Sequence, residues 1–293
     1  MTIDTMRSLL DIPAPAKINL FLHITGRRAD GYHLMQSVFV LLDLCDTLHI
    51  ETRADGRISR ADIGSSTQGS DPLPDNDLCV RAARLLQATT GCTQGAHIQL
   101  EKRIPTQAGL GGGSSDAAST LLALNKLWRT RLSRQELTAI GLQLGADVPF
   151  FLLGDNAWVE GIGEQLTAID YPPTPFMLLK PPVGLSTIQI FKDPNLKRDT
   201  KPATIAGFAE IENEHKHLFG RNDLQPVAET HCPDIRHCVD LLKAYQPSAR
   251  MTGSGSTVFA PWFLNHDLQA IPSNWYHLRC MSLKNHPLKH WAD

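Results

Sequence analysis

The sequence predicts a protein of the α+β class with two domains. Its 293 residues are long enough for one large or two ordinary domains. Stretches rich in leucine and β-branched residues dominate the start of the chain, whereas the second half mixes helical and strand-like segments. A proline-rich run at residues 171–175 marks the division. We therefore expect domains at residues 1–170 and 171–293.

The first elements are strands. Residues 16–25, 37–44 and 47–52 are strand-like and are separated by Gly/Asp turns, which predicts a meander or curled sheet. Residues 53–75 are polar and rich in Gly, Ser and Asp, so we expect an exposed connection. A helix follows from Leu78 to near Gly91, with Asp75 or Asn76 as its cap.

The next elements surround a glycine-rich segment. A strand at residues 97–104 leads into it, and a helix at 114–128 follows. The helix is apolar over too wide a surface to face solvent, so we expect it to be central and buried. Ser133 and Glu136 form a capping-box pattern that opens another helix, which ends near Gly145.

The second half predicts a small α+β sandwich. Its strands are expected at residues 176–180, 256–260 and 275–281. Helical stretches are expected near Ile188 and at residues 234–245.

Composition indicates small-molecule chemistry. The net charge of −2 at pH 7 and the scattered Lys and Arg residues give no basic surface for nucleic acid. The six cysteines lack a C-x-x-C pair, as expected for reduced thiols. No apolar run reaches about 18 residues, and residues 1–11 lack a signal-peptide pattern, so we expect no membrane span and a cytoplasmic location.

One cluster resembles a metal site only weakly. His231-Cys232 and His237-Cys238 are spaced poorly for zinc. A helix that begins near Pro233, with Cys238 facing the core, explains the same residues. We therefore predict no protein-built metal site.

The glycine-rich segment is the strongest functional signal. Gly109-Leu110-Gly111-Gly112-Gly113 places four glycines in five positions, directly before the alanine-rich helix. Glycine lets several N–H groups converge on one anion, toward which the following helix directs its dipole. The pattern predicts a cradle for a polyphosphate, and a tight surface turn is the alternative.

Spacing excludes the best-known nucleotide motifs. A Walker-type P-loop needs a lysine before its Ser or Thr, but Gly113 precedes Ser114 here. A dinucleotide-binding fingerprint needs a third glycine where Ser114 stands, after the first strand of a βαβ unit. The H-R-D and D-F-G motifs of protein kinases do not occur in the sequence.

Three segments, in order, resemble the motifs of the GHMP kinases, the superfamily named for galactokinase, homoserine kinase, mevalonate kinase and phosphomevalonate kinase. These segments are residues 15–20 (PAKINL), 105–115 (PTQAGLGGGSS) and 251–259 (MTGSGSTVF). Other segments are similar to the branch of the superfamily that phosphorylates diphosphocytidyl methylerythritol. They lie at residues 26–33, 145–151, 161–164, 191–194 and 222–224.

The resemblance implies a fold and a reaction. The fold has an N-terminal domain like ribosomal protein S5 domain 2 and a C-terminal ferredoxin-like domain, with the active site between them. The reaction transfers a phosphoryl group from ATP, accompanied by Mg²⁺, to a hydroxyl of 4-diphosphocytidyl-2-C-methyl-D-erythritol. The acceptor is expected to be the 4-hydroxyl, on the assumption that this hydroxyl carries no phosphate. The product is a 2-phosphate of the non-mevalonate isoprenoid pathway. A monomer or a homodimer is expected.

Asp147 and Lys17 match the catalytic pair of the related kinases. Phosphoryl transfer to an alcohol needs a base for the hydroxyl proton and positive charge near it. From spacing alone, Asp147 is better explained as the N-cap of a short helix. Lys17 lies in an otherwise apolar strand, where an ammonium that reaches water from an edge position is the alternative. The resemblance favours a base and its cationic partner.

The resemblance also assigns the ligand-binding residues. One set is expected to bind the nucleotide: Pro105, Ala108, Gly109, Leu110, Gly111, Gly112, Gly113, Ser114 and Ser115. The other is expected to line the substrate site, with Tyr32 and His33 holding the cytosine ring and Phe191 as a second aromatic face: Asn19, Tyr32, His33, Lys102, Thr187 and Phe191.

Several positions near the loop keep two interpretations. Ser114 or Ser115 either helps to bind phosphate or metal, or caps the helix. Asp116 would repel a polyphosphate unless it turned toward the metal or the helix amides. Gln107 stands where related loops often carry glycine, which leaves the contact of residues 106 and 107 with nucleotide open. Gly253 and Gly255 form a second glycine turn near the site, or a plain hairpin corner.

Two other functions compete with this one. The first is a kinase for another alcohol, such as homoserine or mevalonate, which the Tyr32-His33 pair argues against. The second is a nucleotide-binding regulator that has lost catalysis. The presence of both Lys17 and Asp147 argues against that loss.

Overall fold

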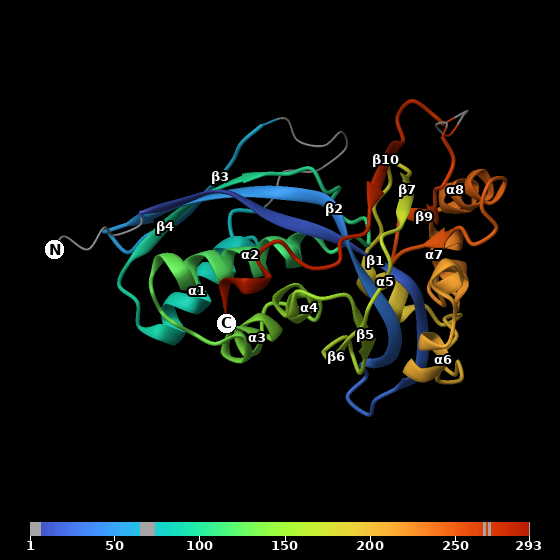
Figure 1. The fold of residues 1–293 in the computed structure, drawn as a ribbon, viewed down its shortest axis with the longest axis horizontal. Coiled ribbons are helices and arrows are strands. Elements are labelled where there is room, and N and C mark those ends of the chain that lie inside the picture. Colours follow the sequence, from blue (N-terminus) through green and yellow to red (C-terminus); the bar gives the residue numbers. More distant parts are fainter. Residues whose placement is uncertain (1–6, 65–73, 266–267, 269–270, 293) are drawn as a thin grey trace.

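Two β-sheets organise the chain in the computed structural model, which describes residues 7–64, 74–265, 268 and 271–292 (Figure 1). Helices α1 to α4 lie against the first sheet, and α7 and α8 lie beside the second (Figure 1). One of the two apolar cores contains residues of both sheets. It includes Ile18 and Val38 from the first sheet and Leu178 and Phe259 from the second. The protein is of the α+β class, as the sequence predicts.

The first sheet is built on two long strands, β1 (Ser8–Arg27) and β2 (His33–Arg53), which pair antiparallel. Within the sheet, five strands follow the order β3-β4-β2-β5-β6, and β1 pairs with β2 outside this order. Register shifts fall between Pro15 and Lys17 and between Asn19 and Leu22, so irregularities bracket Lys17 and Asn19. Such bulges re-aim side chains and are common near active sites. The remaining strands are β3 (Ile58–Asp62), β4 (Gly95–Glu101), β5 (Ala157–Glu160) and β6 (Gln165–Ala168).

Helix α2 (Gly112–Leu127) is the central helix of the first half. It packs against β1 and against α1 (Leu78–Thr90), α3 (Arg134–Leu142) and α4 (Val148–Leu153). Its burial on nearly all sides confirms the prediction from its wide apolar surface. The capping box of Ser133 and Glu136 at the start of α3 is also confirmed.

The second sheet has the order β10-β7-β9-β8, and its neighbouring strands are antiparallel. Numbered within this half, the order is 4-1-3-2, which is that of a ferredoxin-like sheet. Between β9 and β10, the described residues carry no helix. The strands are β7 (Pro175–Lys180), β8 (Arg250–Met251), β9 (Val258–Pro261) and β10 (Tyr276–Met281).

Helix α8 (Pro233–Lys243) packs on β7, β8 and β9. The other helices of this half connect the strands or flank the pocket described below. They are α5 (Thr187–Lys192), α6 (Ile205–Ala209) and α7 (Gln225–His231), with 3₁₀ turns η1 (Asn213–Leu218) and η2 (Lys289–Trp291).

The structure corrects several predictions for the first half of the chain. Residues 53–75 are not only a connection, because β3 pairs parallel to β4 within them; residues 65–73 lie outside the described residues. The N-cap of α1 is Asp77, whose side chain accepts a hydrogen bond from Val80 N, rather than Asp75 or Asn76. The strands expected at 37–44 and 47–52 are one strand, β2, because pairing with β1 resumes beyond a register shift.

The end of the chain returns to the first sheet. After β10, Leu283 N donates to Leu41 O, and Arg134 N, at the start of α3, donates to Ala292 O. Figure 1 shows this segment in red, running back past α2 to end beside α1 and α3. We call residues 282–292 the C-terminal strap. The chain passes from the first sheet to the second between β6 and β7. The predicted domain division between residues 170 and 171 lies in this connection and stays a prediction.

Candidate active site

A pocket of about 620 Å³ contains most of the residues singled out in the sequence. The glycine-rich loop between β4 and α2 forms one wall, and the turn that contains Gly253 lies opposite it. One arm extends to the first turn of α1, and another reaches α5. Of the predicted residues, those that line the pocket are Lys17, Asn19, Lys102, Pro105, Ala108, Gly109, Leu110, Gly111, Gly112, Gly113, Ser114, Asp147, Thr187 and Phe191.

The glycine-rich loop needs glycine at two positions for different neighbours. Gly109 has a φ of 74°, and a Cβ there would lie 2.3 Å from Thr252 O in the opposite turn. Gly111 has a φ of 73°, and its Cβ would lie 3.0 Å from the Phe151 ring and 3.1 Å from Lys17 Cγ. Both φ values are left-handed conformations that favour glycine. The loop therefore packs closely against the Gly253 turn and the side chain of Lys17.

Helix α2 starts two residues earlier than predicted, and this changes the interpretation of its serines. Gly111 is the N-cap, and no side chain caps the helix, so neither Ser114 nor Ser115 has that role. Ser114 lines the pocket, whereas Ser115 is fully buried and does not line it. Gln107 adopts a left-handed φ of 49° and still lines the pocket, as Thr106 does.

Lys17 and Asp147 meet at the pocket. Lys17 Nζ lies 3.3 Å from Asp147 Oδ2, although one residue is on β1 and the other precedes α4. The lysine side chain is 4% exposed, so it does not reach water from an edge position. Its ammonium also donates to Asn19 Oδ1 at 2.7 Å and lies 4.3 Å from the centroid of the Phe39 ring. A buried ammonium thus has a carboxylate, an amide oxygen and an aromatic face as partners.

Asp147 occupies the N-cap position of α4 without acting as a cap. Its side chain makes no capping hydrogen bond, and the residue has helical rather than extended dihedral angles. The carboxylate is instead directed toward Lys17 and remains 32% exposed at the pocket. The geometry leaves this carboxylate accessible to a ligand.

Asn19 links Lys17 to the second sheet. Its backbone N–H donates to Thr252 Oγ1 at 2.8 Å, and its amide nitrogen donates to Ser37 Oγ. Asn222 in turn donates to both Met251 O and Gly253 O, which fixes the turn that faces the glycine-rich loop. The Gly253 turn is therefore part of the pocket wall.

The predicted cytosine-binding residues are only partly brought together. The rings of His33 and Phe191 lie 5.3 Å apart, and Thr187 Oγ1 is 2.7 Å from Ser254 Oγ. His33 does not line the pocket, and Tyr32 is 60% exposed and outside it as well. Burial, with the neighbouring charges of Arg198 and Arg27, lowers the pKa of His33, which favours a neutral ring.

Lys102 and Asp116 both line the pocket next to the loop, where they are paired with each other. Lys102 Nζ contacts both Asp46 and Asp116, and the Asp116 contact is 2.8 Å. Asp116 therefore turns toward a lysine, an arrangement that the sequence did not suggest. Burial raises the pKa of Asp116 well above its ordinary value even though Lys102 opposes the shift, and Asp46 adds to it.

Sequence reasoning missed several residues of the site. Asn76, Asp77 and Arg81 line the arm at the start of α1, where only the helix itself was expected. Arg198 Nε donates to His33 Nε2 at 2.9 Å, from a segment without a recognisable pattern. An unusual charge within an apolar run marked Lys17 in the sequence, and the resemblance to the related kinases gave it a role; no comparable signal marked these other residues.

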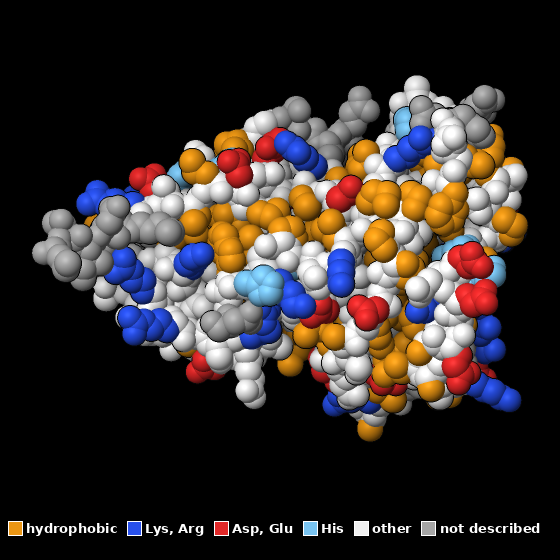
Figure 2. Space-filling model, viewed as in Figure 1, with side chains coloured by type: hydrophobic (Ala, Val, Ile, Leu, Met, Phe, Trp, Pro, Cys, Tyr) orange, Lys and Arg blue, Asp and Glu red, His pale blue; other side chains and the backbone are white. Residues whose placement is uncertain are grey.

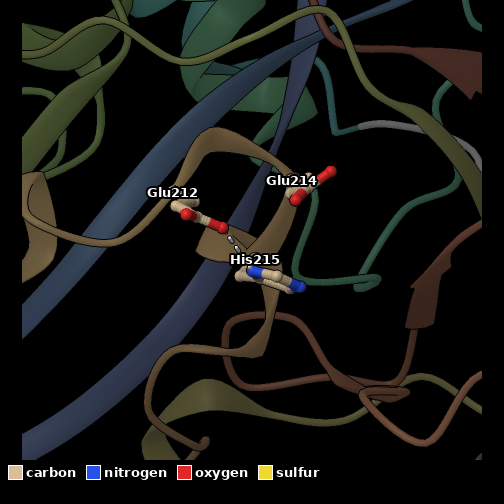
Figure 3. A group of neighbouring side chains, drawn as sticks. All are labelled: Glu212, Glu214 and His215. Carbon is tan, nitrogen blue, oxygen red and sulfur yellow. Dashed lines mark ion pairs between the residues drawn. The ribbon is translucent and has the colours of Figure 1, made fainter.

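A group of metal-ligand type lies outside the pocket. Glu212, Glu214 and His215 are exposed around η1, and His215 Nδ1 lies 3.3 Å from Glu212 Oε2. One ligand atom from each of the three residues lies within 4.8 Å of the others (Figure 3). His231, from the cluster considered for zinc in the sequence, lies with its Nε2 2.8 Å from Asp193 Oδ2. Among the described residues, all six cysteines are free.

Acidic and basic side chains are interspersed over the face in Figure 2. In the described part of the chain, every helix is too short or too polar to cross a membrane.

Comparisons with known proteins agree with this geometry. The family description "GHMP kinases N terminal domain" matches residues 77–155, and "GHMP kinases C terminal" matches residues 202–270. A protein of Polaromonas naphthalenivorans named 4-diphosphocytidyl-2-C-methyl-D-erythritol kinase is 60% identical, over 98% of this chain and 97% of its own. One of the same name from Delftia acidovorans is 57% identical, over 98% of each chain.

Solved structures show the same fold. A crystal structure of 4-(cytidine 5'-diphospho)-2C-methyl-D-erythritol kinase has a TM-score of 0.74 and 31% identity, and covers 94% of this chain and 98% of its own. Homoserine kinase from Cytophaga hutchinsonii has a TM-score of 0.69 at 15% identity, which indicates a shared fold alone; it covers 98% of this chain and 97% of its own. The chain belongs to the GHMP kinases and, within them, to the family of 4-diphosphocytidyl-2-C-methyl-D-erythritol kinases.

Proposed function

We propose that the protein transfers the γ-phosphoryl group of ATP to a hydroxyl of 4-diphosphocytidyl-2-C-methyl-D-erythritol. The observation that carries this proposal is the Lys17–Asp147 pair beside a glycine-rich loop, in a chain 60% identical to a kinase of that name. The reaction supplies a 2-phosphate intermediate to the non-mevalonate isoprenoid pathway. A cytoplasmic location and a monomer or homodimer belong to the same proposal.

The acceptor is the 2-hydroxyl, and the expectation of a 4-hydroxyl is wrong. The name of the substrate places the diphosphocytidyl group on position 4, so the oxygen there is already esterified. A product with its new phosphate at position 2 requires the oxygen at that position as the nucleophile.

Asp147 is proposed to accept the proton of that hydroxyl as the oxygen attacks the γ-phosphorus. Its carboxylate is accessible at the pocket, and the ammonium of Lys17 lies 3.3 Å from it. The same ammonium, fixed by Asn19, opposes negative charge that develops on the transferred group. Burial strengthens this interaction because little water competes for the ammonium.

The glycine-rich loop is proposed to bind the phosphates of ATP. Residues 109–114 line the pocket, and the N–H groups of the first turn of α2 have no partners within the helix. The predicted acceptor residues Thr187 and Phe191 occupy the arm toward α5. The base of ATP is therefore assigned to the other arm, toward Asn76 and Arg81.

Mg²⁺ is proposed to accompany ATP. The hydroxyl of Ser114, in the first turn of α2 at the pocket, is an oxygen donor of the kind this ion prefers and would help to hold it. When bound, the ion would supply positive charge that offsets the negative charge of the ATP phosphates. The exposed Glu212 group is not assigned to this role.

The cytosine ring is proposed to bind near His33 and Phe191. Because Arg198 donates to Nε2, a neutral His33 carries its proton on Nδ1 and can donate to a pyrimidine. Phe191 supplies an aromatic face beside it. Tyr32 is exposed beside this position, where it could cover a bound ring.

The test is ADP release with ATP, Mg²⁺ and the diphosphocytidyl substrate, compared with homoserine and mevalonate. We expect turnover with the cytidyl substrate alone, and we expect Asp147→Asn to lower kcat by about 10² or more. Asp240→Asn, on the exposed side of α8, is the matched control and should retain full activity.

Each other outcome has a distinct meaning. Turnover with homoserine or mevalonate would reject the substrate assignment while keeping a kinase. ATP binding without turnover would favour the non-catalytic regulator. An Asp147→Asn protein within a few-fold of the original kcat would reject Asp147 as the base.

A further inference from the structure

A buried charged triad lies against the glycine-rich loop, and two of its members, Lys102 and Asp116, line the pocket. It consists of Asp46 on β2, Lys102 just after β4 and Asp116 in the first turn of α2. The side chains of Asp46 and Asp116 are 0% and 2% exposed, and that of Lys102 is 10% exposed. Lys102 Nζ would lie 3.2 Å from a Cβ on Gly112, so the ammonium sits against the loop itself.

Asp46 continues the strand pairing where the backbone ladder stops. The last pair between β2 and β4 is Thr47 with Glu101. Beyond it, the Asp46 carboxylate accepts hydrogen bonds from Arg103 N at 2.6 Å and Ile104 N at 2.8 Å, and its other oxygen contacts Lys102 Nζ. One buried carboxylate thus holds three consecutive residues that lead into the loop. Hydrogen bonds to a charged acceptor are the strong kind.

The far end of the loop is held through the same ammonium. Lys102 Nζ donates to Asp116 Oδ2 at 2.8 Å, and Asp116 belongs to the helix that follows the loop. The two ends of the segment 105–113 are therefore connected through one lysine between two carboxylates. Arg103 does not add charge here, because its guanidinium pairs with Glu101.

We propose that Asp46 is a positioning residue for nucleotide binding, which fixes the start of the glycine-rich loop directly and ties it through Lys102 to Asp116 at the loop's end. It touches no substrate in this proposal, since Asp46 does not line the pocket. Its effect is on where the N–H groups of residues 109–113 point. The inference rests on the proposed binding of ATP phosphates by this loop.

The test replaces Asp46 with asparagine, which keeps the shape but turns an amide N–H₂ or a weaker acceptor toward Lys102 and the two backbone donors. We expect the Kd for ADP, measured by calorimetry, and the KM for ATP to rise at least about tenfold because the cradle is displaced. The KM for the diphosphocytidyl substrate and kcat at saturating ATP should stay within about threefold, because the Lys17–Asp147 pair is not touched.

Asp43→Asn is the matched control on the same strand. Asp43 is exposed and accepts a hydrogen bond from Met281 N, away from the loop. It should leave the ADP affinity and both KM values unchanged. A folded Asp46→Asn protein that binds ADP with the original Kd would overturn the proposal. So would a fall in kcat with unchanged KM values, since that pattern indicates only a smaller folded fraction.

Asp116→Asn keeps the inference testable if Asp46→Asn does not fold. An asparagine there still accepts from Lys102 but loses its charge, so the ADP Kd should rise by about threefold. An unchanged Kd would reject the connection between the loop ends. Direct ADP binding also separates this inference from the proposed function, because a protein that binds ADP but transfers no phosphoryl group would fail only the latter.

Discussion

At the scale of single residues, this site depends on charges that the fold removes from water. The sequence singled out Lys17 as a charge within an apolar strand, but the resemblance to the related kinases, rather than the pattern itself, favoured a role at the site. The sequence did not identify Asp46, because an aspartate between two strand-like runs was interpreted as part of a turn. The structure runs β2 straight through that position and buries the carboxylate. Whether an aspartate at such a position is buried or lies in an exposed turn depends on pairing between strands that are distant in the sequence. The local sequence does not contain that information.

Lys17→Met should separate the proposed catalytic role of this ammonium from any role in folding. Methionine keeps a similar length and an apolar stem against Phe39, but it removes the charge that faces Asp147. We expect kcat to fall by about 10² or more, as for loss of a group that stabilises transition-state charge. The free energy of unfolding should change by about 1 kcal/mol or less, because the remaining carboxylate of Asp147 is partly exposed to water. Steady-state kinetics and urea unfolding measure the two quantities.

Lys126→Met is the matched control for that variant. Lys126 Nζ lies 4.5 Å from the centroid of the Trp291 ring, so it also pairs a lysine with an aromatic face, but it is exposed at the other end of α2. Its kcat should equal that of the unaltered protein. If Lys17→Met retained kcat within a few-fold, the ammonium would have only a structural role.

At the scale of elements, the glycine-rich loop has two kinds of glycine. Gly109 has a left-handed φ and faces the backbone of the Gly253 turn, whereas a Cβ on Gly113 would meet nothing closer than Leu78 Cδ1 at 3.4 Å. Sequence analysis treated the four glycines alike, as positions for anion contact. Close packing between two loops from different halves of the chain distinguishes them, and that contact exists only in the folded protein.

Alanine substitutions at Gly109 and Gly113 should therefore change stability in opposite directions. Gly109→Ala should lower the free energy of unfolding by at least about 1–2 kcal/mol, because it adds left-handed strain and a clash with Thr252 O. Gly113→Ala lies in the first turn of α2 and should raise it by up to about 1 kcal/mol. Urea unfolding of the free proteins measures both. Equal effects would show that the contact with the Gly253 turn contributes nothing to stability.

At the scale of the whole molecule, the fold class and most elements followed from pattern, but their connections did not. The apolar width of α2 predicted a central helix, and the turn and cap residues predicted most boundaries. The strand β3 was missed because its residues, 58–62, are polar and become a strand only by pairing with β4. The C-terminal strap was not predicted at all, because its contacts to α3 and to the end of α4 join residues more than 100 positions apart.

His286 makes the strap sensitive to acid. The residue is 2% exposed, its backbone N–H donates to Gly154 O at the end of α4, and its Nδ1 accepts from Leu288 N. Burial, aided by the charge of Arg134, lowers the pKa of His286 to about 4 from an ordinary value of 6.5. Below pH 6.5 the unfolded chain therefore binds more protons at this residue than the folded one does. The stability it contributes is fully present above that pH and is lost as the pH falls toward 4.

His286→Asn should remove this part of the pH dependence, because the asparagine oxygen can accept from Leu288 N but does not titrate. Between pH 7.5 and pH 5, we expect the free energy of unfolding of the unaltered protein to fall by about 2 kcal/mol more than that of the variant. Urea unfolding at both pH values measures the difference. Buried His23 and partly buried His33, whose pKa values are also lowered by burial, contribute equally to both proteins and cancel. His277→Asn, at an exposed position on β10, tests for any general effect of losing an imidazole. The same loss on acidification in His286→Asn as in the unaltered protein would mean that the strap stays open enough for His286 to be protonated in the folded state.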